Sequence, residues 1–425
     1  MVSAGPAASG APSMTEQQPR RISRYVSAAA IAVVAGAAAW LATRSLQQDL
    51  AAYWVAGAAR RAGLSPYVNH VGGTLAPDLW DGVAVFAHSR FLYPPLAAEA
   101  FRPLARLPYL AAKLVFTFAS VAAWCAASVA AARQTGSRDV TSMFAAGALA
   151  YPLYLHLERG QLDLLLLPLL LAAVAAERPA RAGLALAAAA AFKPTLLALV
   201  PVLAALGRRR AAGFALAGAA AIVLATFVVS GPALTREYAR EVLPRAALYG
   251  EGGDASMLLP FSRLETRASD LEDGAATVDG RTYRQAAWSG PASASLPRLV
   301  APDGPTKAAT RAPVLLLLGA LLIAARAVRR RGAASQALVL WATALGCVSA
   351  SPAGWVMGFV WALPLVAWLG ALRGPEPPPS WWALALACVV CACPPPAAAW
   401  APLAGLALVA AAVWLALAQP REGAA

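Results

Sequence analysis

Long apolar segments alternate with short polar segments along the whole chain. The blocks 26–41, 199–206 and 314–325 contain almost no polar residues, so they show neither the alternation of a half-buried strand nor the single apolar stripe of a surface helix. A helix of about 17 to 25 apolar residues can cross the hydrocarbon core of a bilayer. This criterion predicts membrane spans at residues 25–46, 109–132, 141–157, 161–176, 211–230, 313–327, 335–351, 355–372, 381–393 and 397–417.

The apolar segment 182–206 differs from the other spans. It lies between two arginine clusters, Arg178 with Arg181 and the run 208–210, and it is interrupted at Lys193 and Pro194. Arginine clusters that flank spans mark the cytoplasmic side, so one crossing would put one cluster on the wrong side. We therefore predict a broken hairpin with Lys193 near its apex, which requires the irregular backbone to be covered by protein or to line a cavity.

With this hairpin, the arginine clusters all fall on the cytoplasmic side and two long loops fall on the outer side. Long loops in a compact membrane bundle are usually functional, so the chemistry is expected outside. The prediction is an all-α polytopic membrane protein with about 11–12 transmembrane or re-entrant helices. Its parts are a disordered cytoplasmic tail (1–24), an N-terminal transmembrane catalytic module (25–230) with the extracytoplasmic loop 47–108, a second extracytoplasmic loop (231–312), a C-terminal transmembrane module (313–418) and a cytoplasmic tail (419–425).

Composition supports lipid as the solvent and excludes nucleic acid as a partner. Of the 425 residues 60% are hydrophobic and 13% are charged, which is too apolar for a soluble domain. The net charge of +14 is spread over short clusters between apolar blocks, without a continuous basic face carrying aromatic residues. Cys388, Cys391 and Cys393 lie in an apolar segment without charged neighbours, so they are interpreted as core residues.

Asp49 is the first candidate for chemistry because it follows the first span directly. An ionisable group at the edge of the hydrocarbon costs free energy unless something uses it, although an interfacial carboxylate that faces water is the simpler alternative. The segment 53–67 predicts a short amphipathic helix that ends in a Gly and Pro turn, with Arg60 and Arg61 on its polar face. The aromatic and proline residues of 91–108 then fit the floor of a lipid-facing cleft or an interfacial belt.

Two further polar features interrupt the apolar spans. The turn Glu158-Arg159-Gly160-Gln161-Leu162-Asp163 is either a solvated loop or part of a site. Lys193 lies inside an apolar stretch, so it needs a carboxylate such as Asp163 or a lipid phosphate as its partner. Serine elbows, phosphate-binding loops and paired-histidine metal motifs are all missing from the sequence, so no metal and no cofactor is predicted.

Read in order, these segments resemble glycosyltransferase family 87. The matching pieces are 49–67, Tyr93-Pro94-Pro95, 101–108, Gly160-Gln161, 192–195 and the basic run 208–210. The family comprises multi-span enzymes of the GT-C fold that use a polyprenyl-phosphate sugar, typically mannose. The resemblance implies the same fold and an integral membrane hexosyltransferase in the cell membrane, active on the extracytoplasmic face. Its implied partners are a polyprenyl-phosphate sugar donor, a lipid or glycan acceptor and the membrane lipids.

The resemblance also implies roles for single residues. Asp49 matches the family's general base, and Tyr93 belongs to the element beneath the donor. The implied phosphate ligands are Lys193, Arg159 and Arg263, and the implied substrate-binding residues are Gln161, Asp163, Asp254, Ser256 and Trp355. The chain departs from the family pattern at Asp163 and Asp254, which replace asparagine, and at Met357 and Gly358, where mannosyl-transferring members often carry a histidine pair.

The implied mechanism is an inverting single displacement. A polyprenyl phosphate is a good leaving group, so the enzyme needs a carboxylate to take the proton of the acceptor hydroxyl and cations to hold the departing phosphate. Two alternatives remain open. A transporter or flippase for a lipid-linked sugar would share the cleft, but only one broken segment is present where transporters often show two. The second alternative is an inactive scaffold, which the missing histidine pair leaves open.

Overall fold

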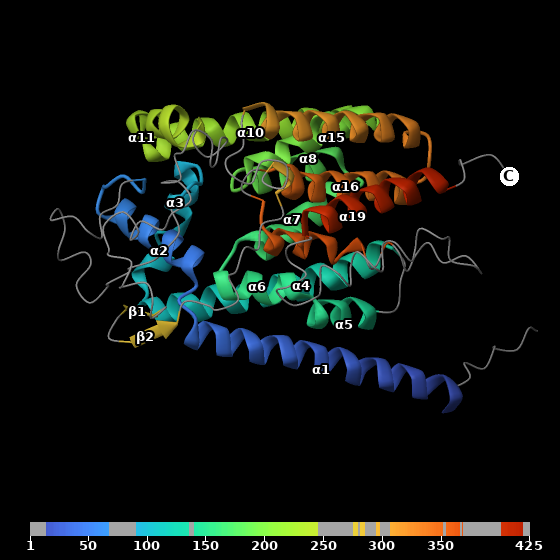
Figure 1. The fold of residues 1–425 in the computed structure, drawn as a ribbon, viewed down its shortest axis with the longest axis horizontal. Helices are drawn as coiled ribbons and strands as arrows, with labels where there is room; N and C mark the ends of the chain where they lie inside the picture. Colours follow the sequence, from blue (N-terminus) through green and yellow to red (C-terminus); the bar gives the residue numbers. More distant parts are fainter. Residues whose placement is uncertain are drawn as a thin grey trace, which may run out of the picture.

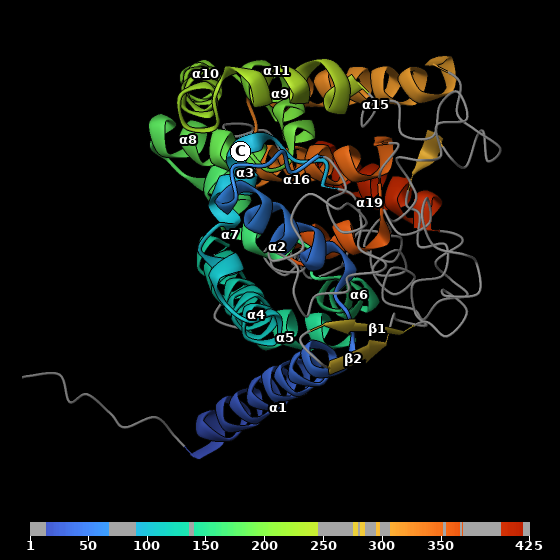
Figure 2. The same cartoon turned by 90° about the vertical axis from the view of Figure 1, so that its left-hand side faces the viewer.

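The computed structural model describes residues 14–67, 91–135, 140–244, 275–278, 281–284, 295–297, 307–351, 354–365, 368 and 401–419. These residues form a bundle whose long helices run side by side, with α2, α3 and a small β-hairpin gathered at one end (Figures 1 and 2). The N-terminal half contains α1 (Met14–Arg44), α2 (Gln48–Arg61), α3 (Pro95–Phe101), η2 (Leu104–Arg106), α4 (Tyr109–Gln134), α5 (Thr141–Leu149), α6 (Tyr151–Arg159) and α7 (Asp163–Ala175). It is followed by α8 (Pro179–Ala190), η3 (Pro194–Ala198), α9 (Leu199–Ala205), α10 (Arg209–Ser230), α11 (Pro232–Glu237), η4 (Tyr238–Val242), β1 (Ala275–Val278), β2 (Arg281–Arg284), α15 (Lys307–Val328), α16 (Ala333–Ala350), η8 (Val356–Ala362) and α19 (Ala401–Ala418).

Among the described residues, six helices are long and apolar enough to cross a membrane. They are α1 from Ser23, α4, α10, α15 from Arg311, α16 and α19. Each coincides with a span predicted from the apolar pattern, so the polytopic helical architecture is confirmed.

The outer helices of the bundle expose large apolar side chains. Only 22% of the apolar window of α10 is buried, whereas 78% of that of α16 is buried. Apolar surface of this extent is unfavourable in water and fits lipid. The exposed side chains on α10 and α15 are Phe214, Leu216, Val223, Leu224, Phe227, Val228, Val229, Val314, Leu315, Leu316 and Ile323.

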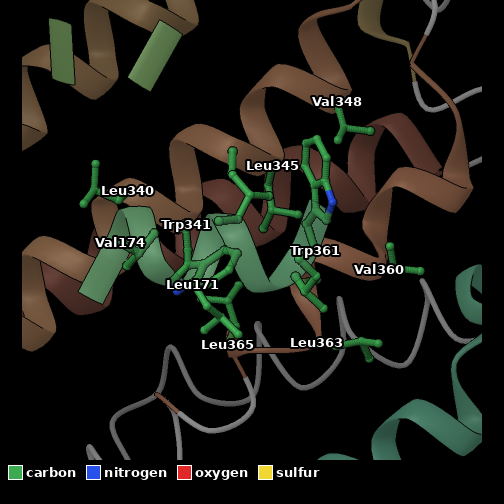
Figure 3. Close-up of a cluster of buried hydrophobic side chains, with 14 of the residues drawn as sticks. Leu171, Val174, Leu340, Trp341, Leu345, Val348, Val360, Trp361, Leu363 and Leu365 are labelled. Atoms are coloured by element: carbon green, nitrogen blue, oxygen red, sulfur yellow. The ribbon is translucent and has the colours of Figure 1, made fainter. Parts of the chain in front are cut away.

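The core packs α7, α16 and η8 against one another. Trp341 of α16 and Trp361 of η8 are both buried, and Leu171 and Val174 of α7 belong to the same cluster (Figure 3). Each large ring buries much apolar surface inside the protein and fills the space between the helices. This packing fixes η8 against the N-terminal module, which matters because η8 contributes to the site described below.

The predicted broken hairpin at 182–206 is confirmed. Gly183 of α8 lies against Ala211 at the beginning of α10, and Gly218 further along α10 lies against Ala187, so α8 and α10 run in the same direction. The chain between them must therefore return through η3 and α9. The Arg208 guanidinium donates hydrogen bonds to the carbonyl oxygens of residues 174 and 176 at the end of α7 (2.7 and 3.0 Å), which places both arginine-rich ends of the hairpin on one side.

Two predicted spans are not single α-helices. The segment 141–157 is divided at Ala150 (φ −81°, ψ 109°) into α5 and α6, because Pro152 has no N–H to bond the Ala148 carbonyl oxygen four residues back, and in a continuous helix its ring would clash with that carbonyl. The described part of 355–372 is the 3₁₀ helix η8, in a segment that contains Gly358 and Pro364, both poor helix formers. The segment 161–176 forms α7, which is shorter than a full span.

The N-terminal segment and the second loop contain regular structure that was not predicted. Helix α1 begins at Met14, so the part of the predicted tail from residue 14 to residue 24 is helical in the structure. The loop 231–312 contains the antiparallel hairpin β1–β2, joined by Asp279-Gly280, a dipeptide that favours tight hairpins. The predicted span 381–393 and its three cysteines lie outside the described residues.

The predicted amphipathic interfacial helix is instead a buried helix, α2. Its residues from Asp49 to Ala59 are all buried. One side packs on η2, α4 and Tyr283 of β2, and the other side packs on α3. Arg60 forms an ion pair with Glu99 of α3 (2.7 Å), and Arg61 donates to the Ala105 carbonyl oxygen (2.6 Å), so the arginines join elements within the protein. The predicted turn after the helix is confirmed at Gly63, whose φ is +76°.

Candidate functional site

The candidate site begins with Asp49 in the first turn of α2. Only 8% of Asp49 is exposed, and one carboxylate oxygen, Oδ2, accepts a hydrogen bond from Gln161 Nε2 at 2.7 Å. A carboxylate at the N-terminus of a helix is stabilised by the unpaired N–H groups and the helix dipole. None of the ion pairs among the described residues involves Asp49, so its charge is not neutralised by an adjacent cation there.

Two tyrosines fix the orientation of Gln161. The Tyr53 hydroxyl donates to Gln161 Oε1 at 3.1 Å, and the Tyr93 hydroxyl lies 3.4 Å from the same oxygen. The two hydroxyl oxygens are 2.9 Å apart. Burial raises the pKa of Tyr53 and of Tyr93 well above the ordinary value, so both keep the proton that they donate. Because the amide oxygen receives these bonds, the amide NH₂ group must face Asp49.

The turn that carries Gln161 approaches α2 closely at Gly160. Gly160 has a φ of +70°, in the left-handed region that glycine adopts easily. A Cβ atom at this position would lie 2.6 Å from the Leu50 Cβ atom and 3.2 Å from the Gln47 Cβ atom. The absence of a side chain at Gly160 therefore sets the distance between the Gln161 turn and the start of α2.

The substitution Gly160→Ala should lower turnover by about 10²-fold, because the clash would move the turn away from Asp49 by a distance on the order of 1 Å. Gly63→Ala is the matched control: Gly63 has φ +76° but no atom within 4 Å of an added Cβ. Both variants pay the left-handed backbone cost of about 1 kcal/mol, and only Gly160→Ala adds the clash. Thermal unfolding and turnover of the two purified variants provide the comparison, and equal turnover in both would contradict the importance of this close approach.

Lys193 and Asp163 form an ion pair next to this network. Lys193 Nζ lies 2.6 Å from Asp163 Oδ1, and the side chain of Lys193 is 25% exposed whereas that of Asp163 is fully buried. Trp361 of η8 donates from its indole N–H to the Asp163 carbonyl oxygen at 3.1 Å, and its ring lies 5.3 Å from Lys193 Nζ. Of the two partners considered for Lys193, the described structure provides the carboxylate, and the exposed part of the lysine leaves room for a second ligand.

Arg159 and Glu158 complete the turn. The Arg159 guanidinium donates to the side-chain oxygen of Gln48 and so reaches the start of α2. Burial raises the pKa of Glu158 to about 7, against a smaller opposing effect of Arg159. Glu158 therefore carries less negative charge at neutral pH than a surface glutamate.

The structure brings together most of the residues that the sequence identified. Asp49 and Gln161 are joined directly, Tyr93 adjoins Gln161, and Asp163 pairs with Lys193. Trp355 lies at the N-cap of η8. Asp254, Ser256 and Arg263 lie outside the described residues.

Three residues of the site were missed at the level of sequence. Tyr53 was assigned to an amphipathic helix, and Trp361 was placed only within the predicted span 355–372. Lys113 of α4 is fully buried one helical turn into a membrane span. The rule that drew attention to Lys193 would also have found Lys113, because an ionisable residue inside a span is a functional candidate by default.

Within the described ranges, no group of three or more His, Cys, Asp or Glu side chains is arranged to hold a metal ion.

The fold and the site together define a polytopic helical membrane protein with a buried polar cluster at one end of its bundle. The sequence model of glycosyltransferase family 87 matches residues 91–352, more than half of the chain, and the protein belongs to this family. The family indicates a membrane glycosyltransferase. Tyr93, Arg159, Gln161, Asp163, Lys193, Asp254, Ser256 and Arg263 lie within the matched range, whereas Asp49 and Trp355 lie outside it. Neither a curated protein nor a solved structure matches the chain.

Proposed function

We propose that this protein transfers a sugar, a hexose such as mannose, from a polyprenyl-phosphate donor to a lipid or glycan acceptor on the extracytoplasmic face of the cell membrane. Asp49 acts as the general base in an inverting displacement. It removes the proton of the acceptor hydroxyl while the bond between the anomeric carbon and the phosphate breaks. The phosphate leaves with the polyprenol, and the product carries the opposite anomeric configuration.

The observation that carries this proposal is the geometry of Asp49. Its carboxylate is buried, held by Gln161 and unpaired with any cation among the described residues. A base of this kind must be positioned and must keep its free electron pairs for the substrate proton. Gln161 contacts only one of the two carboxylate oxygens in the described structure, which supports Oδ1 as the atom that accepts the proton.

The proposed donor contact is Lys193. Its partly exposed side chain stands at the apex of the 182–206 hairpin, near the same end of α7 as Gln161. Tyr93 adjoins Gln161 and Arg159 reaches Gln48 at the start of α2, so they are proposed to contact the donor as well. Cations around the departing phosphate would stabilise the charge that develops in the transition state.

The proposed face of the membrane follows from the arginines. Arg178 and Arg208 lie at the end of α7 that is opposite to Asp163, and spans are oriented with such arginines in the cytoplasm. Helix α7 has 13 residues, about 20 Å in length, so Asp163 and Asp49 are far from this side. This separation supports an extracytoplasmic site.

A cysteine at Ala62, after α2, should react with a membrane-impermeant thiol reagent in intact cells, whereas a cysteine at Glu177, between α7 and α8, should react only after the cells are opened. Both positions are exposed in the structure. The unchanged protein, which retains its five native cysteines, provides the background. Labelling of Glu177→Cys in intact cells with protection of Ala62→Cys would reverse the orientation and exclude an extracytoplasmic site.

The direct test uses purified protein in lipid vesicles with radiolabelled polyprenyl-phosphate hexoses, supplied one at a time with membrane glycan and lipid acceptors. Formation of a labelled product with inverted anomeric configuration is the expected result. Movement of intact donor across the vesicle membrane without transfer would identify a transporter instead. Donor binding with neither transfer nor movement would identify an inactive scaffold.

A further inference from the structure

The short connection between α1 and α2 is held in place by one face of α4. Tyr109, Lys113 and Thr117 follow one another at intervals of one helical turn, so their side chains line a single stripe of α4. All three hydrogen-bond the connection that leads from the end of α1 to the first turn of α2. Asp49 lies in that first turn.

Each residue of the connection has its own partner on this stripe. The Lys113 ammonium donates to the Ser45 carbonyl oxygen, and the Tyr109 hydroxyl donates to the Leu46 carbonyl oxygen. The Gln47 amide donates to Thr117 Oγ1 at 2.8 Å and to the Leu157 carbonyl oxygen at 2.8 Å. The last carbonyl groups of a helix lack partners within the helix, so these donors satisfy groups that would otherwise be costly to bury.

The backbone of the connection is strained where these contacts meet. Gln47 has a φ of +55° and is the only residue other than glycine with a positive φ among the described residues. Such a conformation is unfavourable for a residue with a Cβ atom and persists when surrounding contacts over-determine it. Gln47 is 1% exposed and is placed between the α4 stripe and the close approach of Gly160.

Lys113 also connects this junction to the second long loop. Its ammonium group lies 3.6 Å from the centroid of the Tyr283 ring on β2, and Tyr283 is buried against Tyr109 with ring centroids 6.0 Å apart. No carboxylate pairs with Lys113 in the part of the chain that the structure describes. A buried cation of this kind depends on the Ser45 carbonyl oxygen and on the aromatic face of Tyr283, and it loses the aromatic face if the loop moves away.

We infer that Lys113 is a positioning residue for Asp49: with Tyr109 and Thr117 it holds the α1–α2 connection in the conformation that presents the carboxylate, and Tyr283 completes this clamp from the second extracytoplasmic loop. The inference rests on the proposed function, because it assigns the clamp to the base of the transfer reaction. Lys113 and Tyr283 lie outside the short motifs on which the resemblance to the family was based. The inference also gives the β1–β2 hairpin a role, since the hairpin lies beside the end of α1 (Figures 1 and 2) and its Tyr283 ring packs on Lys113 and Tyr109.

The expected result of Lys113→Met is a fall in kcat of roughly 10- to 100-fold with an unchanged KM for the donor, because the carboxylate is displaced while the proposed donor contacts remain. Tyr283→Leu should lower kcat in the same direction, and Tyr283→Phe, which retains the ring face, should retain turnover. Val115→Met is the matched control on α4, because Val115 is 54% exposed on the lipid side.

Two measurements separate positioning from a general loss of structure. If Lys113 acts through Asp49, Lys113→Met should lower kcat much less in an Asp49→Asn background than in the wild type; equal factors in both backgrounds would overturn the inference. Hydrogen exchange of the purified protein should be faster at residues 45–52 in Lys113→Met than in Val115→Met. Equal exchange at residues 45–52 in the two variants would overturn the clamp itself. This measurement does not depend on the proposed function, so it would decide the clamp even if Asp49→Asn turned over rapidly. If Asp49→Asn inactivates the enzyme and Lys113→Met does not, only the role of Lys113 is refuted.

Discussion

Asp49→Asn is expected to lower kcat by about 10²- to 10⁴-fold while the KM for the donor stays nearly unchanged, since this is the range that a positioned general base contributes. Asparagine retains the shape of the side chain and an oxygen that can accept the Gln161 hydrogen bond, but it cannot take a proton from the acceptor hydroxyl. The donor contacts proposed at Lys193 are unaffected by the substitution. Initial rates over a range of donor concentrations, measured on folded protein, provide the comparison.

Asp49→Glu is the companion variant. It retains the charge but extends the side chain by one methylene group in a buried site where Gln161 already lies 2.7 Å from the carboxylate. A displacement on the order of 1 Å can cost about 10²-fold, so glutamate should restore little of the lost turnover. Rapid turnover in Asp49→Asn would exclude this residue as the base, and Glu158, Asp163 and Asp254 would be the next residues to test.

Lys193→Met is expected to destabilise the protein and to weaken donor binding, and a second substitution separates the two effects. Asp163 is fully buried, and its Oδ2 atom has no hydrogen-bond partner among the described residues, so removal of Lys193 leaves a buried carboxylate unpaired. Breaking a buried ion pair costs about 3–5 kcal/mol, and the partial exposure of Lys193 puts the cost toward the lower end. Thermal unfolding in detergent measures this loss.

The double variant Lys193→Met with Asp163→Asn should recover most of the stability, because no charge remains buried. It should not recover donor binding: a charge-assisted hydrogen bond to phosphate contributes about 1.5–3 kcal/mol, which corresponds to about 10- to 100-fold in affinity. Asp163→Asn alone, which retains the cation, is the control. Normal binding of polyprenyl phosphate by the stable double variant would restrict Lys193 to a structural partner of Asp163.

The sequence alone predicted the parts of the fold that depend on local composition. The spans at 109–132 and 211–230 were found because the match between an apolar helix and lipid is a property of consecutive residues. The broken hairpin was found because arginines at Arg178 and Arg208 restrict the direction of the chain between them. The division at Pro152 was missed, although proline is a local signal, because the surrounding apolar run is long enough for a span.

The contacts of the candidate site were decided by the tertiary structure. Asp49 and Lys193 were selected from sequence as isolated ionisable groups near apolar segments, but the pairing of Asp49 with Gln161 joins residues 112 positions apart. The burial of α2 depends on α3, α4 and β2 together, so its arginines could be interpreted as facing solvent until those elements were in place. The clamp formed by Lys113 and Tyr283 has the same origin: a helix stripe and a distant hairpin meet only in the folded chain, because their cohesion comes from packing and hydrogen bonding between segments rather than from the preference of either segment.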